Sequence, residues 1–531
     1  MATTQLLNNK FGGIREKNAI FSSDLITAKD IQNVELYDTG SNGGVGIRTT
    51  KGNISKLLIP NENIINIFES IQGGKSHTII HTETETTGKL YLLNNDVLVP
   101  IKTDLIKTSE SNGFDITQGW SDYFFFTTGS EMFLLEIYKK NLDPDGNFVD
   151  YSNEIVNTIT RFEPKDRDSR KVIGIGACLF DNRLWIFNKN ILWYSVQGDI
   201  KDFGGLDTSI NDSEIVTTSG YIEELKNITA IHEYLGSLAV FFKDSSILLS
   251  ISSGEISQSE QYIGGCSGRN ALVFHDTNLY FYDDTKKAVY SFQQVVTGER
   301  TLGNNCATEV QETIEQTLTN ASKILAVSVF VENRNEIWWL LPTNDENYST
   351  ILIYDYLKGE WVKRKSQKLN IIKVIDNKLY SADTKGNLLT EYSTDTFNGE
   401  HIQHYYKCSP LDLGATNTLK IFVFPPRINF DLPYSNKFFV KYIKNFNTVK
   451  KPKVKFIKTA YKNVLLWDIG FWDINTWESK NTSAIGKFPN ATFKILEIEI
   501  YTDEKVEEID RKGQTFAIKN IEISKIKVKQ V

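Results

Sequence analysis

The feature that most constrains the fold is a set of three short apolar runs between residues 172 and 198, VIGIGACLFDNRLWIFNKNILWYSVQG. Asp181 and Asn182 separate the first run from the second, and Asn188–Asn190 separate the second from the third. Short runs rich in Val, Ile, Phe, Trp and Tyr, with Asn or Asp turns between them, are typical of an antiparallel meander. The middle run, Leu184–Phe187, is apolar at consecutive positions. It therefore predicts a strand covered on both faces, as in a propeller blade between two neighbours.

The same unit recurs along the chain. Each copy holds an apolar run, a turn with Asp, Asn or Gly, a hydrophobic run such as LAVFF, LYFY or IWWLL, a second turn and a third run. Four further copies are clear and two are looser; they lie at Thr229–Ser250, Asn270–Phe292, Ile324–Trp361 and Leu369–Tyr392, and at Ser76–Ile101 and Phe114–Tyr138. Their starts are roughly 40–60 residues apart, a period typical of propeller blades. The sequence predicts an all-β chain with a β-propeller of about seven blades, with six or eight left open.

The remaining segments are defined relative to these repeats. Residues 1–56 contain two strand-like runs, Ile31–Tyr37 and Val45–Thr50. We expect an N-terminal arm with strands that complete the last blade and close the ring; the alternative is an arm that lies on the surface. Residues 57–400 are predicted to form the propeller, with insertions near 139–171 and 298–322. The second insertion places Val310, Ile314 and Leu318 at helical spacing, which predicts a helix that docks on a partner or packs on its own domain.

Residues 401–531 are predicted to form a C-terminal β-sandwich. Strand-like runs continue through this region, and Phe493–Ile500 alternates apolar with charged residues, as a sheet with one solvated face does. Between the runs lies a tryptophan-rich loop, Trp467–Trp477, which either anchors the sandwich or offers a platform to a ligand or partner. Nine lysines between Lys437 and Lys462 indicate either contact with nucleic-acid phosphates or a solvated strand face.

No motif for catalysis or nucleotide binding stands out. The nearest match to the Asp-box of sialidase-type propellers, Ser381–Gly386, is one residue too long and lacks the tryptophan. A glycosidase needs two carboxylates that face one cleft, and a chain with 66 Asp and Glu residues and no motif nominates no pair. The phosphate-binding patterns GxxxxGKS/T and GxGxxG are absent, and Gly40–Gly46 lies between two strand-like runs, as a hairpin loop does. We therefore expect no enzyme activity.

Two groups of residues have some features of a zinc site. His77 and His81 share one face of a strand but would stand about 13 Å apart at strand rise, which is too far for one ion. His401, His404 and Cys408 have no fourth ligand nearby in the sequence.

Residues 141–152 resemble a calcium loop in their first half, up to Gly146. The twelfth position is Ser152, so the bidentate glutamate is missing, and Pro-Asp-Gly is a strong turn signal by itself. We therefore predict no catalytic, cofactor-binding or metal-binding residues.

The net charge and the cysteine content indicate which partners and which cellular compartment suit the protein. The net charge of −7 is mild and argues against nonspecific binding of nucleic acid by the whole chain. The four cysteines are widely spaced and form no CxxC, so we expect free buried thiols in a protein made in the cytoplasm. We expect no secretory signal, and apolar runs such as Leu238–Phe242 are too short to cross a bilayer.

Several segments together resemble the tail propeller proteins of short-tailed bacteriophages. They are the N-terminal Phe11–Gly13, Ile31–Val34 and Gly46–Arg48, the blade segments Leu184–Phe187, Ile191–Asp199, Gly264–Ser267, Asn270–Phe274, Leu279–Tyr282 and Ile351–Trp361, and the loop Trp467–Trp477. The resemblance extends over nearly the whole chain.

The resemblance implies a structural virion protein, often called the nozzle or hub. Copies would form a ring in the tail, commonly a hexamer, below the portal and its adaptor, with a channel that retains genome DNA and guides it on ejection. It implies contacts with itself, with portal, adaptor and other tail proteins, and with DNA that passes without specific binding, and no contact with a membrane. Rigid discs with wide faces and many loops suit this role. The alternative is a carbohydrate-binding or carbohydrate-cleaving propeller such as a receptor-binding protein, which the aromatic residues and loop-rich faces favour.

Overall fold

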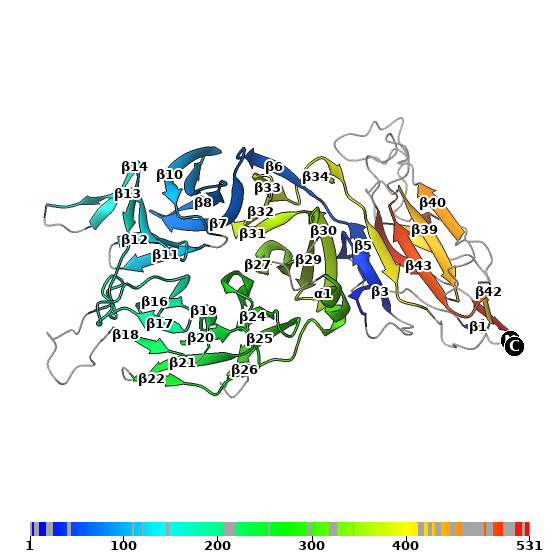
Figure 1. Cartoon of the computed structure of the whole chain (residues 1–531). Helices are drawn as coiled ribbons and strands as arrows, with labels where there is room; N and C mark the ends of the chain where they lie inside the picture. Colours follow the sequence, from blue (N-terminus) through cyan, green and yellow to red (C-terminus); the bar gives the residue numbers. More distant parts are fainter. Residues whose placement is uncertain are drawn as a thin grey trace.

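The computed structural model describes residues 3–4, 10–16, 25–39, 44–108, 111–118, 121–144, 148–204, 219–224, 226–252, 255–294, 300–317, 326–343, 345–411, 419–422, 427–430, 437–445, 453–458, 483–484, 492–502, 516–522 and 526–529. Within these ranges nearly all regular structure is β-strand, arranged as a ring of seven sheets and a second body beside it (Figure 1). The chain is therefore a seven-bladed β-propeller with a second β-domain, as the repeats predicted.

Six blades are antiparallel meanders of four consecutive strands. Their strands are β7 (Asn63–Gln72), β8 (Lys75–Glu83), β9 (Gly88–Asn94) and β10 (Val97–Leu105); β11 (Asn112–Gln118), β12 (Ser121–Thr127), β13 (Met132–Leu142) and β14 (Phe148–Arg161); β15 (Gly176–Phe180), β16 (Arg183–Asn188), β17 (Ile191–Tyr194) and β18 (Gly220–Glu223); β19 (Ile228–Tyr234), β20 (Ser237–Phe242), β21 (Ser246–Ser252) and β22 (Glu255–Gln258); β23 (Leu272–His275), β24 (Asn278–Asp283), β25 (Ala288–Gln294) and β26 (Arg300–Leu302); β27 (Val327–Val331), β28 (Glu336–Leu341), β29 (Tyr348–Asp355) and β30 (Glu360–Gln367).

The seventh blade closes the ring with a strand from the other end of the propeller. Its first three strands are β31 (Leu369–Ile375), β32 (Lys378–Asp383) and β33 (Asn387–Glu391), and the fourth is β6 (Asn53–Leu58). β6 pairs antiparallel with β33, from Asn53 opposite Glu391 to Leu58 opposite Asn387, and β31 contacts β7 of the first blade. A short hairpin, β34 (Thr396–Phe397) and β35 (Glu400–His401), extends the same sheet beyond β6.

The strand that closes the ring is not one of the two runs expected to do so. Ile31–Tyr37 falls on β3 (Leu25–Gln32) and β4 (Val34–Asp38), and Val45–Thr50 on β5 (Val45–Thr49). All three strands pair within the second domain, and β6 crosses the expected boundary at residue 56. Ile31, Val34 and Ile47 of β3–β5 are fully buried, whereas Ile54 and Leu58 of β6 stay exposed on the rim of the ring.

The second strands of the blades are buried on both faces, as the unbroken apolar runs predicted. In β16, Leu184 and Ile186 pack in a cluster with the second blade, whereas Trp185 and Phe187 pack in a cluster with the fourth. All six residues of β20 and of β28 are buried in the same manner. Side chains alternate between the faces of a strand, so one apolar run fills the spaces on both sides of its blade.

Three of the outer strands, β18, β22 and β26, could not be predicted from the sequence pattern. β18, β22 and β26 are only three or four residues long, and none of their residues is buried. The insertion expected between blades near residues 139–171 lies mostly within one, because β13 and β14 form a hairpin much longer than its counterparts. The distal part of this hairpin projects from the propeller on the side away from the second domain (Figure 1).

The expected helix forms in the connection between the fifth and sixth blades. A short 3₁₀ segment, Thr308–Val310, leads into α1 (Gln311–Thr317), and Val310 and Ile314 are fully buried. Leu318 lies outside the described residues. The Glu16 carboxylate accepts hydrogen bonds from the Glu312 and Thr313 amides, at 2.6 and 3.0 Å, so the helix packs on its own chain. Two further 3₁₀ segments are Arg269–Ala271 and Glu332–Arg334.

The second domain is built from both ends of the described chain. Its largest sheets are a six-stranded one in the order β2-β3-β36-β43-β39-β40 and a five-stranded one in the order β4-β5-β44-β38-β41. The strands not yet bounded are β2 (Lys10–Ile14), β36 (Tyr405–Cys408), β38 (Arg427–Phe430), β39 (Lys437–Lys444), β40 (Lys453–Lys458), β41 (Ser483–Ala484), β43 (Leu496–Tyr501) and β44 (Ala517–Glu522). A third sheet joins β1 (Thr3–Thr4), β45 (Ile526–Lys529), β37 (Leu419–Phe422) and β42 (Thr492–Phe493).

The two large sheets face each other as a sandwich. The Phe438 ring of the six-stranded sheet lies 5.6 Å from the ring of Phe516, next to β44 of the five-stranded sheet, and β2 contacts β4, β5 and β44. The C-terminal β-sandwich expected from the alternating runs is therefore present, but it also takes in the N-terminal strands.

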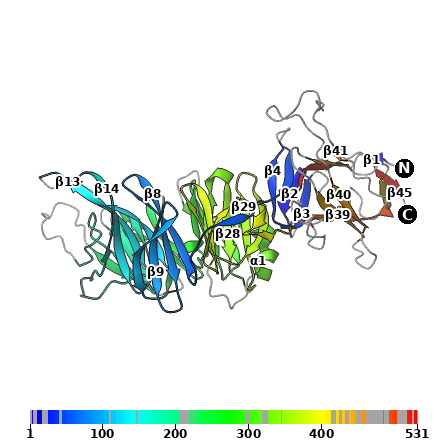
Figure 2. The same ribbon diagram turned by 90° about the horizontal axis from the view of Figure 1, so that it is seen from above.

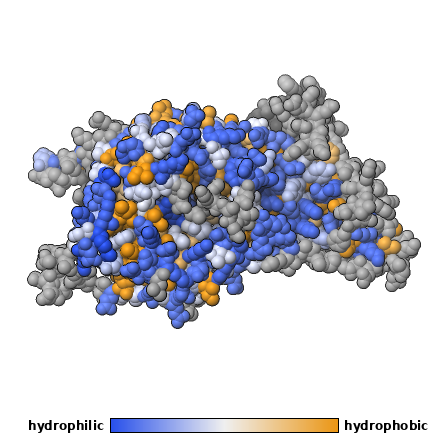
Figure 3. Space-filling model, viewed as in Figure 1, coloured by the Kyte–Doolittle hydropathy of each residue, from blue (hydrophilic) through white to orange (hydrophobic). Residues whose placement is uncertain are grey.

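The molecule is elongated, with the propeller at one end and the sandwich at the other, and both termini lie at the far end of the sandwich (Figures 1 and 2). The outer strand β30 of the sixth blade contacts β2, β3 and β4, which places the sandwich against the rim of the ring. On the face in Figure 3, apolar residues of the propeller form small separate groups among polar ones. In the described part of the chain, no helix has the length and apolarity needed to span a bilayer.

Candidate functional site

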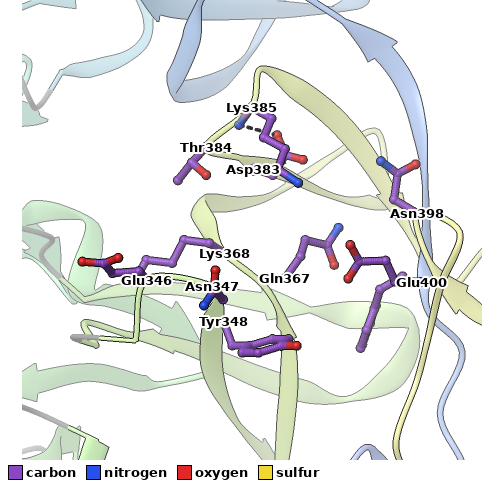
Figure 4. Close-up of a pocket in the computed structure, with 11 residues that line it drawn as sticks. Glu346, Asn347, Tyr348, Gln367, Lys368, Asp383, Thr384, Lys385, Asn398 and Glu400 are labelled. Carbon is purple, nitrogen blue, oxygen red and sulfur yellow. Dashed lines mark hydrogen bonds between the residues drawn. The ribbon is translucent and has the colours of Figure 1, made fainter. Parts of the chain in front are cut away.

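A polar pocket of about 290 Å³ opens between the sixth and seventh blades, on the side of the ring nearest the sandwich (Figure 4). Four segments line it: the turn before β29 with Glu346–Tyr348, the junction of β30 and β31 with Gln367 and Lys368, the β32–β33 turn with Asp383–Lys385, and the β34–β35 hairpin with Phe397, Asn398 and Glu400. Each segment is a turn or a connection at a strand end, where propellers carry their variable binding groups.

Two charged side chains fix the backbone of the pocket wall. The buried Asp383 carboxylate accepts hydrogen bonds from the Lys385 and Asn387 amides, at 2.8 and 2.9 Å, and from the Asn387 side chain at 2.8 Å. The Lys368 ammonium donates to the carbonyl oxygens of Thr343 and Asp345, at 3.0 and 2.6 Å. Burial lowers the pKa of this ammonium. Both groups therefore hold the shape of the pocket wall, because most of their hydrogen bonds are to backbone groups.

Other groups of the pocket remain available. Among the described residues, the side chains of Glu346, Asn347 and Glu400 have no hydrogen-bond or ion-pair partner, and all three are exposed. The Tyr348 ring is 43% exposed, and the Lys365 ammonium lies 4.4 Å from its centroid. Figure 4 shows Asn347, Gln367 and Glu400 on the side of the pocket where the Tyr348 ring lies. The pocket lining contains no histidine or cysteine, so it offers amides, carboxylates, two lysines, a threonine hydroxyl and two aromatic rings.

Beneath the pocket lies a buried charged network that the sequence pattern did not reveal. Arg364 and Glu391 form an ion pair at 2.5 Å with side chains that are 1% and 0% exposed. Asn53 of β6 donates to Glu391 at 2.9 Å, and the Lys51 carbonyl accepts from Arg364 at 2.7 Å. The network thus joins residues 51 and 53, at the start of the strand that closes the ring, to β30 of the sixth blade and β33 of the seventh. No local motif could signal these contacts, because Lys51 and Asn53 are more than 300 residues from their partners Arg364 and Glu391.

His77 and His81, the two histidines of the first blade, are buried in its core. His81 is fully buried, its Nδ1 lies 3.0 Å from the Ser111 hydroxyl, and burial lowers its pKa to about 3. His77 packs against Tyr138, with ring centroids 5.2 Å apart. No group of three His, Cys, Asp or Glu side chains able to hold a metal ion occurs among the residues that the structure describes.

The second histidine group is similar. Burial lowers the pKa of His404 to about 3, and its Nε2 lies 3.4 Å from the Thr50 carbonyl. Cys408 is a fully buried free thiol, and burial raises its pKa. The other three cysteines are free as well.

The segment that resembles a calcium loop is part of a β-ladder. Asn141 of β13 pairs with Asp150 of β14, and its side-chain amide donates to the Asp150 carboxylate at 2.7 Å. Residues 145–147 lie outside the described residues. The segment resembling an Asp-box, Ser381–Gly386, supplies the turn that Asp383 holds, so it is a structural element of the pocket wall.

The structure describes only one of the two remaining candidates, and that one in part. Trp467–Trp477 lies outside the described residues. In the lysine-rich window Lys437–Lys462, β39 and β40 pair antiparallel, and Lys441 forms an ion pair at 2.8 Å with Glu499 on the neighbouring strand.

The fold and the pocket define a class: a seven-bladed β-propeller protein with a β-sandwich and a polar pocket between two blades. No protein-family model and no curated protein matches the chain.

Among solved structures, the chain is similar to the designed protein Ika8, with a TM-score of 0.35 and 11% identity over 64% of this chain and 99% of that one. It is also similar to the WD40 domain of Pan2 from Neurospora crassa, with a TM-score of 0.35 and 10% identity over 65% and 94%. For a protein from Lactobacillus plantarum, the TM-score is 0.37 and the identity 9%, over 68% and 99%. The assignment of the fold to the propeller class rests on the strand pairing within this chain.

Proposed function

We propose that this protein is a structural subunit of a phage virion that forms a ring, commonly a hexamer, in the tail of a short-tailed phage. The ring lies below the portal and adaptor, retains genome DNA and guides it on ejection. The observation that carries the proposal is that separate segments of the family-like pattern meet in space. Gly13 donates its amide to the Glu360 carboxylate at 2.9 Å, and a Cβ at Gly13 would lie 2.5 Å from the Trp361 carbonyl.

Asn33, a third member of the pattern, lies at the same junction. Its amide donates to the Lys363 carbonyl at 2.9 Å, its side-chain oxygen accepts from the Lys365 amide at 2.8 Å, and its side-chain nitrogen donates to the Gln403 carbonyl at 2.9 Å. Three of the family-like segments, Phe11–Gly13, Ile31–Val34 and Ile351–Trp361, thus help to hold the sandwich against β30 of the propeller. These hydrogen bonds favour one fixed arrangement of the two bodies, which a subunit of a rigid ring needs.

Charged residues reinforce the same junction. Arg15 bridges Glu309 and Glu360, at 3.2 and 3.0 Å, and Lys363 pairs with Asp30 at 2.5 Å. Partly buried pairs of this kind specify orientation more than they stabilise. Because the projecting β13–β14 hairpin and the sandwich lie on opposite sides of the propeller, each copy offers two different surfaces for head-to-tail contacts in a ring.

The test is averaged electron microscopy of purified tails with two antibody-fragment markers, one against the β13–β14 hairpin and one against the sandwich. We expect both markers to repeat around the tail axis with a fixed angular offset, because both surfaces belong to every subunit of a closed ring. Marker at fibre tips would favour a receptor-binding protein instead. Absence of the protein from virions would refute the proposal.

A further inference from the structure

We propose that the pocket between the sixth and seventh blades binds a neutral sugar residue. This is a binding site additional to the structural role above and does not depend on it. The pocket volume of about 290 Å³ lies at the lower end of the range for small-ligand sites, so it suits a single sugar ring rather than a larger ligand.

The charges of the lining exclude a strongly ionic ligand. The pocket holds three carboxylates, those of Glu346, Asp383 and Glu400, and two ammonium groups. Asp383 and Lys368 both bind backbone groups, which leaves the carboxylates of Glu346 and Glu400 and the ammonium group of Lys385 to face a ligand. A phosphate or nucleic-acid backbone would meet an excess of negative charge here, whereas a neutral ligand with many hydroxyls can use acceptors and donors alike.

One hydrogen-bond acceptor of the pocket, the side-chain oxygen of Gln367, has no partner. The surrounding hydrogen bonds show which end of the Gln367 amide is the oxygen. Asn53 donates its side-chain nitrogen to Glu391, so its oxygen must be the acceptor for the Gln367 side-chain nitrogen, 3.0 Å away. The Gln367 Oε1 is then the end that lacks a partner, and this oxygen is buried without one. A buried acceptor without a donor is unfavourable, and a ligand hydroxyl is a donor that would satisfy it.

The Glu400 side chain lies next to the Gln367 amide in the pocket (Figure 4). Glu400 is exposed and has no partner among the described residues, and Figure 4 shows its carboxylate facing the Gln367 amide. Rotation of the Glu400 side chain opens Gln367 to a ligand and leaves the carboxylate as a second acceptor for hydroxyl groups.

Tyr348 supplies the apolar surface that a sugar needs. The C–H face of a pyranose ring stacks on aromatic rings, and the Tyr348 ring is large, 43% exposed and steadied by the Lys365 ammonium. Asn347 adds an unpaired amide next to it, and both residues lie on the turn whose backbone Lys368 holds. An aromatic surface with amide and carboxylate groups beside it is the combination by which polar pockets orient a neutral ligand.

The experiment uses the full chain and a panel of methyl glycosides of glucose, galactose, mannose, rhamnose and N-acetylglucosamine, with inorganic phosphate as the ionic probe. Saturation-transfer difference NMR detects binding, and titration calorimetry gives the affinity. We expect at least one glycoside to bind with a Kd of roughly 1 mM, phosphate not to bind, and Tyr348→Ala to weaken binding by about tenfold or more. Tyr348→Phe keeps the stacking surface and should retain most of the affinity.

Tyr221→Ala is the matched control. Tyr221 is 40% exposed and lies 4.3 Å from the Arg170 guanidinium, so it resembles Tyr348 in exposure and in its cationic neighbour but lies on the third blade. Binding unchanged in Tyr221→Ala and lost in Tyr348→Ala supports the site. The proposal is overturned if no glycoside gives a signal at about 10 mM, if phosphate binds in preference, or if both alanine variants bind equally well.

Discussion

The propeller and the sandwich are made of the same kind of strand but are connected in opposite ways. Six blades of the propeller are each a run of four consecutive strands, and one long-range pairing, β6 with β33, closes the ring. The six-stranded sheet of the sandwich instead places β3 beside β36 and β36 beside β43, so it joins residues near 30 to residues near 407 and 500.

Because of this difference, the folding of the sandwich depends on both ends of the chain, whereas the folding of the propeller does not. Local hairpins form without waiting for distant segments, whereas a sheet with strands from both ends pays the entropy of closing a very long loop. The propeller is in effect inserted into the sandwich between β5 and β36. We therefore expect the propeller to keep its fold when the sandwich is lost, provided that β6 remains.

Two truncations that differ by eight residues give the largest contrast. Deletion of residues 1–50 removes β2–β5 and should unfold the sandwich, while the propeller keeps a cooperative transition in calorimetry. Deletion of residues 1–58 also removes β6, with its pairing to β33 and its bonds to the buried Arg364–Glu391 pair, and should abolish that transition. Equal behaviour of the two truncations would show that β6 does not hold the ring closed.

The substitution Arg364→Met should destabilise the contact between β6 and its neighbouring strands by a smaller amount. It leaves the Glu391 carboxylate buried without its cation, which costs about 3–5 kcal/mol, and urea unfolding followed by tryptophan fluorescence would measure it. The double variant Arg364→Met/Glu391→Leu should regain much of the loss, because two apolar side chains need no ion partner.

The matched control for this ion pair is an exposed one. Lys378 and Asp376 lie 3.9 Å apart with side chains 65% and 74% exposed, so Lys378→Ala should cost about 0.5 kcal/mol or less. A comparable loss in both single variants would mean that the buried network contributes nothing specific to ring closure.

The same comparison explains which parts of the fold were predictable. The blades could be predicted because their second strands, such as Leu184–Phe187, are buried by adjacent blades and so carry unbroken apolar runs. The outer strands β18, β22 and β26 have no buried residue and therefore left no pattern. The role of Val45–Thr50 was misjudged because a strand-like run predicts a strand but does not indicate which distant strand pairs with it; β5 pairs with β44.

The candidate site was the least predictable part. Asp383 was noticed through its likeness to an Asp-box, yet its role is to hold a turn. Tyr348, Gln367 and Glu400 lie in polar segments with no motif, and only the ring geometry brings them to one pocket. Glycosidase chemistry was rejected in the sequence for lack of a motif, and this expectation remains a prediction.

Substitution of two glycines of the seventh blade can distinguish the cost of backbone strain from the cost of a steric clash. Both have positive φ, +84° at Gly386 and +92° at Gly399, so alanine is strained at either position by about 1 kcal/mol. A Cβ at Gly386 would also lie 2.4 Å from the Ile59 carbonyl and 2.5 Å from the Glu62 carbonyl, whereas nothing lies within 4 Å at Gly399. Urea unfolding should show a loss of about 2–3 kcal/mol for Gly386→Ala and about 1 kcal/mol for Gly399→Ala. Losses of the same size would mean that the segment after β6 can move away from the blade.

The smallest expected effect is on pH dependence, and both bodies should share it. His81 lies in the first blade and His404 at the edge of the sandwich, and burial lowers the pKa of each to about 3. In the unfolded chain a histidine has a pKa of about 6.5. Between about pH 3 and about pH 6.5 the histidine is protonated in the unfolded chain but neutral in the folded chain. The free energy of unfolding therefore falls as the pH falls below about 6.5.

Each histidine should remove about 1 kcal/mol on going from pH 8 to pH 6. The variant His81→Gln keeps a polar group near Ser111 and cannot titrate, so the transition of the propeller should lose less stability on acidification than in the original chain. His404→Gln should protect the transition of the sandwich instead, which makes the two variants controls for each other in calorimetry at pH 6 and pH 8. If either variant flattened the pH dependence of both transitions, the two bodies would unfold as one unit, and the independence inferred from their connectivity would be wrong.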